Sequence, residues 1–188
     1  MSERLSYDLN VDMLNTREKE FNVKKLVEKF ARGIAGKGKR EIESMAKRTF
    51  GEYGENFMER TLELGEKYTD QTYEILKTAI KKTGSLKFPH VPQRFIEIAY
   101  LSIQPFSELN VVENNQFRFI FRIDKCSIFN ALKEACGEKV ANQMPCKHAC
   151  LTASKTLYRD LNLKASVGMD ASMAEDGYCQ FVAKNLEV

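Results

Sequence analysis

Residues 116–123, QFRFIFRI, carry the clearest strand pattern in the chain, because apolar and polar side chains alternate along them. Phe117, Phe119, Phe121 and Ile123 share one face. The segment before it, LNVVE at residues 109–113, is also strand-like, and the two asparagines that follow it suit a hairpin turn. The pattern therefore predicts a β-hairpin with one strongly apolar face.

Downstream of this hairpin, the sequence predicts two helices and then two more strands. The helices are expected over residues 127–144, with an interruption at Gly137, and from Pro145 to residue 161. Residues 163–170 and 177–185 alternate like strands around the loop ASMAEDG. We expect an α+β fold with a mostly antiparallel sheet and two packed helices.

Upstream of the hairpin, helix formers and charged residues dominate. A first helix is predicted over residues 17–34, and a long helical pattern, either one helix or two with a kink, over residues 40–82. An apolar stripe with steps of three and four follows the long segment: Phe57, Thr61, Leu64, Tyr68, Thr72, Ile75 and Ala79. The stripe indicates core packing between helices, with a subunit interface as the alternative.

The chain changes character near residue 84. We therefore predict a helical N-terminal region at residues 1–88 and an α+β module with the cysteines at residues 89–188; one compact domain is the alternative. Between them, His90 is flanked by prolines and is expected in an exposed loop. The following QRFIEIAYLSI favours a helix, although a strand would also suit it.

Composition excludes several classes of protein. The 188 residues carry a net charge of only +3, without a dense basic patch, so no nucleic-acid partner is expected. No apolar run is long enough to cross a membrane. The N-terminal residues do not resemble a secretory signal, which favours the cytoplasm. The five cysteines are therefore expected as free thiols or metal ligands.

The segment MPCKHAC, residues 144–150, is the densest group of reactive side chains. Cys146 and Cys150 are four residues apart and share a helix face, a spacing that suits one zinc, copper(I) or iron ion. Cys146 also lies in the first helical turn, where the helix dipole and Lys147 would lower its pKa. Both a metal ligand and a nucleophile need this thiolate, whereas His148 would project away from the two thiols.

Two further cysteines are expected near this segment. Cys126 ends a predicted strand and Cys179 lies in the last one, so both could meet Cys146 where strand ends and helix starts converge. The alternative is that each of these cysteines is a small buried hydrophobe, which is the reading we favour for Cys136.

The motifs RFIFRIDKC, MPCKHAC and AEDGYCQFVAKN together resemble the L-2-amino-thiazoline-4-carboxylic acid hydrolase-like family. Cys126, Cys146 and Cys179 match three cysteine positions of that family in order, over residues 108–185. A more distant likeness is to vinyl-4-reductase-like small-ligand domains. The resemblance implies a cytosolic α+β protein that hydrolyses a small cyclic amidine with help from cysteine. The sequence departs from the family pattern in EDGYC and in the additional His and Cys of CKHAC.

Two functional hypotheses follow from these residues. In the first, the protein is a hydrolase in which Cys146 is the nucleophile or a metal ligand, His148 is the acid–base group, and Cys126 and Cys179 line the pocket. In the second, it is a non-catalytic module, a sensor or accessory protein, that binds a small molecule or a zinc or iron ion. The predicted metal ligands are Cys126, Cys146, Cys150 and Cys179. A homodimer through the helical region is predicted with either hypothesis.

Overall fold

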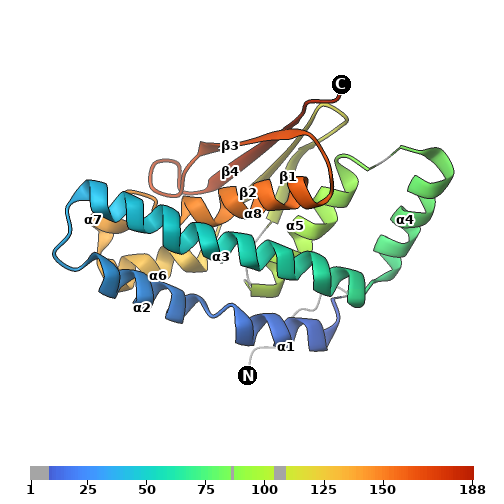
Figure 1. Cartoon of the computed structure of the whole chain (residues 1–188). Coiled ribbons are helices and arrows are strands. Elements are labelled where there is room, and N and C mark those ends of the chain that lie inside the picture. The colour runs from blue at the N-terminus through green and yellow to red at the C-terminus, as the bar shows by residue number, and fades with distance from the viewer. Residues whose placement is uncertain (1–8, 86, 104–108) are drawn as a thin grey trace.

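A computed structural model describes residues 9–85, 87–103 and 109–188 and confirms the α+β class. A four-stranded sheet lies over one side of a group of helices, with α8 (Lys147–Asp160) directly beneath it (Figure 1). The residues preceding position 9, part of the segment in which a secretory signal was sought, lie outside the description. No helix of the described part combines the length and the apolar character that crossing a bilayer requires.

The sheet has the strand order β1-β2-β4-β3, and every neighbouring pair is antiparallel. Its strands are β1 (Leu109–Asn114), β2 (Arg118–Ile123), β3 (Ala165–Ala171) and β4 (Cys179–Asn185). The predicted hairpin is confirmed as β1 and β2. Phe121 pairs with Phe181 on β4, and their rings stack with centroids 5.2 Å apart. Phe117 was wrongly placed on the apolar face, because it precedes β2 and is 57% exposed.

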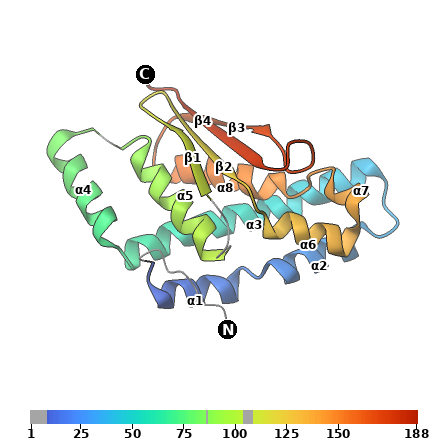
Figure 2. The ribbon, with the colours of Figure 1, turned by 180° about the vertical axis from the view of Figure 1, so that it is seen from behind.

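The first predicted helix is in fact two helices, α1 (Val11–Glu20) and α2 (Val23–Ile34). The chain breaks at Phe21 and Asn22 because the Asn22 side chain caps α2, accepting a hydrogen bond of 3.0 Å from the backbone N–H of Lys25. Seen from behind, α2 runs alongside α6 (Ser127–Cys136), which the chain enters directly from β2 (Figure 2).

The long helical pattern is also two helices, α3 (Lys39–Lys67) and α4 (Gln71–Thr83). They separate where Asp70 caps α4, accepting a 2.8 Å hydrogen bond from the Tyr73 N–H. The predicted stripe is buried along α3 at Phe57, Thr61 and Leu64. On α4 the core interpretation is wrong, because Ile75 is 61% exposed. The homodimer predicted through this region stays a prediction.

Gly54 sets the distance between α3 and α8, which pack along each other. A Cβ atom at this position would lie 2.1 Å from the backbone oxygen of Ala149, so only glycine allows the observed approach. Gly65 likewise lies against Phe95 of α5 (His90–Ile103). Both glycines are therefore points of close packing between helices.

The predicted helix over residues 93–103 is confirmed as α5, but His90 is its first residue and is half-buried, not in an exposed loop. After Gly137 the chain makes a short helix, α7 (Glu138–Ala141), before α8. One hydrophobic core unites residues from both predicted regions, including Phe30, Phe50, Phe121, Leu132, Leu157 and Phe181.

Candidate functional site

Four of the five cysteines come from three places in the fold and form what we call the thiol cluster. Cys126 caps the N-terminus of α6, Cys146 precedes α8, Cys150 lies in the first turn of α8, and Cys179 is the first residue of β4. Cys179 is adjacent to the end of β2 because it pairs with Ile123. Cys136 lies at the other end of α6 from Cys126.

The thiols of the cluster are close enough to influence one another electrostatically. Interaction with Cys126, Cys150 and Cys179 raises the pKa of Cys146. Cys126 and Cys179 likewise raise the pKa of Cys150. The structure therefore gathers the cysteines that the sequence singled out, as helix starts and strand ends meet.

Each thiol of the cluster is held in its neutral form. Burial is the largest cause in every case, and it raises the pKa of Cys179 to about 11 and that of Cys146 well above its ordinary value. The expected lowering of the Cys146 pKa is wrong, because only 4% of this residue is exposed. The Phe129 N–H donates a 3.4 Å hydrogen bond to the Cys126 sulfur, which favours a thiolate, but burial outweighs it.

Metal binding by these thiols stays a prediction. Within residues 9–85, 87–103 and 109–188, no three His, Cys, Asp or Glu side chains are grouped so that they could hold one metal ion. The sulfur atoms thus share a region of the core without the arrangement that zinc or iron would require.

His148 faces α3 and is not brought to the thiols. Its Nε2 atom lies 3.0 Å from a carboxylate oxygen of Glu43. Burial lowers the pKa of His148, and Glu43 opposes this by raising it. The imidazole of His148 is therefore paired with a carboxylate on α3.

Two tyrosines lie near the thiol cluster, and neither was predicted from the sequence. Tyr100 of α5 is 5% exposed, and burial is the largest cause of its raised pKa, to which the nearby Cys150 thiol adds. Tyr53 of α3 lies near Cys150 and Cys126, which both raise its pKa, although burial is the larger cause. Spacing along α3 and α5 predicted only that such aromatics pack in a core.

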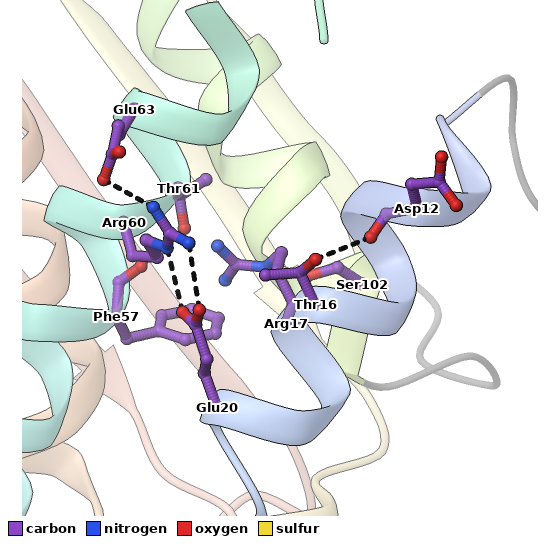
Figure 3. A network of polar contacts seen from close by, with 9 residues as sticks. All are labelled: Asp12, Thr16, Arg17, Glu20, Phe57, Arg60, Thr61, Glu63 and Ser102. Carbon is purple, nitrogen blue, oxygen red and sulfur yellow. Dashed lines mark hydrogen bonds and ion pairs between the residues drawn. The ribbon is translucent and has the colours of Figure 1, made fainter. Parts of the chain in front are cut away.

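A second polar group, Arg17 of α1, is completely buried (Figure 3). Its Nε donates a 2.5 Å hydrogen bond to the Ser102 hydroxyl, and its guanidinium carbon lies 4.1 Å from the centre of the Phe57 ring. Nη1 and Nη2 have no hydrogen-bond partner among the residues that the structure describes. The sequence analysis did not identify Arg17, because it reads as one more charge on an amphipathic helix.

The nearest carboxylates are committed to a different arginine. Glu20 accepts two hydrogen bonds of 2.9 Å from Arg60, and Arg60 also binds Glu63 at 2.7 Å (Figure 3). Burial lowers the pKa of Arg17 to about 9, so its guanidinium is still charged at neutral pH. Arg17 is thus a buried cation with two free nitrogens.

Tyr53 connects Arg17 with the thiol cluster. Arg17 lowers the pKa of Tyr53, whereas Cys150 and Cys126 raise it, so the phenol is close to both. Tyr53 also stacks on Phe57, the ring beneath Arg17, at an interplanar angle of 10°. Arg17, Tyr53, Tyr100 and the thiol cluster therefore form a connected series of polar groups inside an otherwise apolar core.

No protein-family model matches the chain, and no curated protein matches it. Among solved structures, the chain is similar to an H-NOX protein from K. algicida, crystallised in its unliganded Fe(II) form. A point mutant of that protein has a TM-score of 0.41 and 15% identity, with 94% of each chain covered. The unmutated protein has a TM-score of 0.36 and 13% identity over the same shares. Function is therefore argued from the residues of this chain.

Proposed function

We propose that this chain is a non-catalytic module that binds a small molecule in its interior, beside the thiol cluster. The observation that carries the proposal is the burial of Cys126, Cys146 and Cys179, which are 9%, 4% and 7% exposed. Burial is also the largest cause of the raised pKa of each clustered thiol, Cys150 included. A neutral thiol is a small polarizable hydrophobe, suited to line a ligand. It is a poor nucleophile, because the thiolate is the reactive form.

Among the described residues, no base or cation contributes to lowering the pKa of Cys146, as the hydrolase alternative would require. The neighbouring thiols raise its pKa further, and the only nearby imidazole, His148, is paired with Glu43. Cysteine nucleophiles are ordinarily activated by an adjacent base or cation. Cys126 and Cys179 keep their predicted role as residues that line the ligand.

The residues around the thiol cluster have the mixed character of residues that line small-ligand sites. Such sites are mainly apolar, with a few polar groups that fix the orientation of the ligand. Here the apolar part comes from side chains such as Phe121 and Phe181, and the polar groups are Tyr53, Tyr100 and Arg17. This composition supports binding over catalysis.

The proposal is tested on the full chain with two small aromatic probes, indole and benzamide. A binding module should show a rise in melting temperature with at least one probe, together with slower alkylation of Cys146, Cys150 and Cys179 by iodoacetamide. Cys136 serves as the internal control: it lies outside the cluster and is half-buried. Its alkylation should not depend on the probe.

The same protein is then incubated with 2-amino-thiazoline-4-carboxylate. We expect no consumption above that of the Cys146→Ala variant. Turnover that disappears in this variant, combined with rapid alkylation of Cys146 at pH 7, would overturn the binding proposal in favour of the hydrolase.

A further inference from the structure

The two most buried arginines of the described residues differ in the partners of their terminal nitrogens. Arg94 is 9% exposed, and its terminal nitrogens bind carboxylates, with Nη2 on Asp70 and Nη1 at 3.2 Å from Glu97. Arg17 is 0% exposed, and its Nη1 and Nη2 bind nothing. A buried charge without a partner is costly, and folded proteins usually pair it.

The free side of Arg17 is presented in a fixed geometry. The Ser102 hydroxyl donates to the Ala99 carbonyl oxygen at 2.9 Å and accepts from Arg17 Nε, so the hydroxyl is oriented as an acceptor. The guanidinium carbon lies over the Phe57 ring, 4.1 Å from its centre, a contact that favours this position of the side chain. Two terminal nitrogens are thereby left side by side, in the fork that binds a carboxylate with two parallel hydrogen bonds.

The surrounding charges do not fill this fork. Glu20 and Glu63 are held by Arg60, and the side chain of Arg60 is itself 30% exposed (Figure 3). These three groups together carry one net negative charge, but their hydrogen bonds are directed to each other. Tyr53, the other polar neighbour, donates to the carbonyl oxygen of Phe21 at 3.4 Å.

From this contrast we infer that the bound molecule carries a carboxylate, which Nη1 and Nη2 of Arg17 receive in the core between α1, α3 and α5. The inference rests on the proposed function and deepens it by naming the chemical class of the ligand. Because Tyr53 stacks on Phe57, the ring beneath the Arg17 guanidinium, the ligand would be a small carboxylic acid with an apolar body, its charged end at Arg17 and its body beside these two rings.

The test compares benzoate with benzamide, which has the same shape but no charge. We expect benzoate to bind the wild-type chain at least tenfold more tightly, as measured by thermal shift and isothermal calorimetry. In Arg17→Met this preference should disappear. The melting temperature of unliganded Arg17→Met should equal or exceed that of the wild type, because the variant removes an unpaired buried charge.

The matched control is Arg159→Met, at an arginine that is exposed and paired with Glu55, Glu59 and Asp160. It should retain the tenfold preference for benzoate. Arg94→Met, at a buried but paired arginine, should lower the melting temperature and leave that preference in place. A fall in melting temperature for Arg17→Met as large as that for Arg94→Met, with benzoate binding retained, would show a structural role and overturn the inference.

A measurement on the wild type covers the case in which Arg17→Met does not fold. In ¹⁵N-arginine NMR spectra, the Arg17 side-chain signals should shift with benzoate and not with benzamide. Signals that do not move, or that move equally with both probes, would overturn the inference. Thiol protection tests the proposed function separately. If indole or benzamide slows alkylation of the cluster but benzoate does not shift the Arg17 signals, the chain is still a binding module and only the carboxylate inference is overturned.

Discussion

The thiol cluster and Arg17 lie in the same core, and burial has opposite consequences for them. The four thiols are chemically versatile, but burial only raises their pKa values and keeps them neutral, so they fit an apolar interior at little cost. Arg17 is charged at neutral pH and has two nitrogens without partners. A buried group therefore indicates a function most strongly when its burial costs a large free energy. Because burial of the Arg17 charge costs more than burial of neutral thiols, Arg17 is the more informative residue.

The largest expected effect comes from disrupting the contact between α3 and α8, the helix that carries Cys150. In Gly54→Ala the new methyl group would collide with the Ala149 backbone and push α8 away from α3. We expect a loss of about 2–4 kcal/mol in the free energy of unfolding, measured by urea denaturation. Gly51→Ala is the control on the same helix, because its Cβ would meet the Thr152 hydroxyl at an ordinary 3.7 Å. That variant should gain up to about 1 kcal/mol from helix propensity; equal losses in both would contradict the proposed contact.

A smaller effect tests whether the clustered thiols behave as hydrophobes. Cys146→Ser replaces a neutral thiol with a hydroxyl that must be buried, and we expect it to cost about 1–3 kcal/mol of stability. Cys146→Ala leaves a small cavity and should cost less, about 1 kcal/mol. Denaturant midpoints of the two variants give the order. If Cys146→Ser were the milder change, the thiol would have a polar role that its surroundings do not indicate.

The sequence predicted much of the thiol region because its signals are local. Alternation in residues 116–123 placed β2, and the spacing of Cys146 and Cys150 placed both on one helix near its start. The break at Asn22 was missed, and the break in the 40–82 segment was predicted only as one of two alternatives and without its position at Asp70, because the helical pattern continues across both capping side chains. The pKa of Cys146 was misjudged, since local sequence shows a helix N-terminus but not the depth of burial.

The Arg17 region could not be predicted in the same way. Its character depends on Ser102 and Phe57, which are 85 and 40 positions away along the chain, and on the commitment of Glu20 to Arg60. The sequence places Arg17 beside Glu18 and Glu20, which suggests an ordinary solvated helix face. The only local hint is that Arg17 lies three and four residues after Leu14 and Met13, on the face that becomes buried.

Alkaline pH should weaken the protein through the thiol cluster. The folded pKa values of the thiols lie above the unfolded value of about 9, so the folded state binds more protons as pH approaches 9. Stability is then fully present below the unfolded pKa and decreases as pH rises. Each thiol loses about 0.4 kcal/mol when pH equals its unfolded pKa, which gives roughly 1–2 kcal/mol for the cluster at pH 9.

This decrease is measured as the free energy of unfolding between pH 7.5 and 9 in the Arg17→Met variant, because Arg17, with a pKa of about 9, also loses its proton near pH 9 and has the opposite effect on stability. The double variant Cys146→Ala, Cys179→Ala should roughly halve the decrease. An unchanged slope in that variant would assign the alkaline sensitivity to other groups.

The smallest expected effect is the pH dependence of stability that comes from His148, which lies between the thiol cluster and α3. Burial lowers its folded pKa below the unfolded value of 6.5, so the unfolded state binds more protons in mildly acidic solution. Stability is thus present above pH 6.5 and decreases as pH falls below it. His148→Gln can keep a hydrogen bond to Glu43 without titrating, so its free energy of unfolding should vary less between pH 7 and 5. Glu43→Gln removes the carboxylate that raises the His148 pKa, and its decrease should be steeper than that of the wild type; the opposite order would mean that the Glu43 contact does not form in solution.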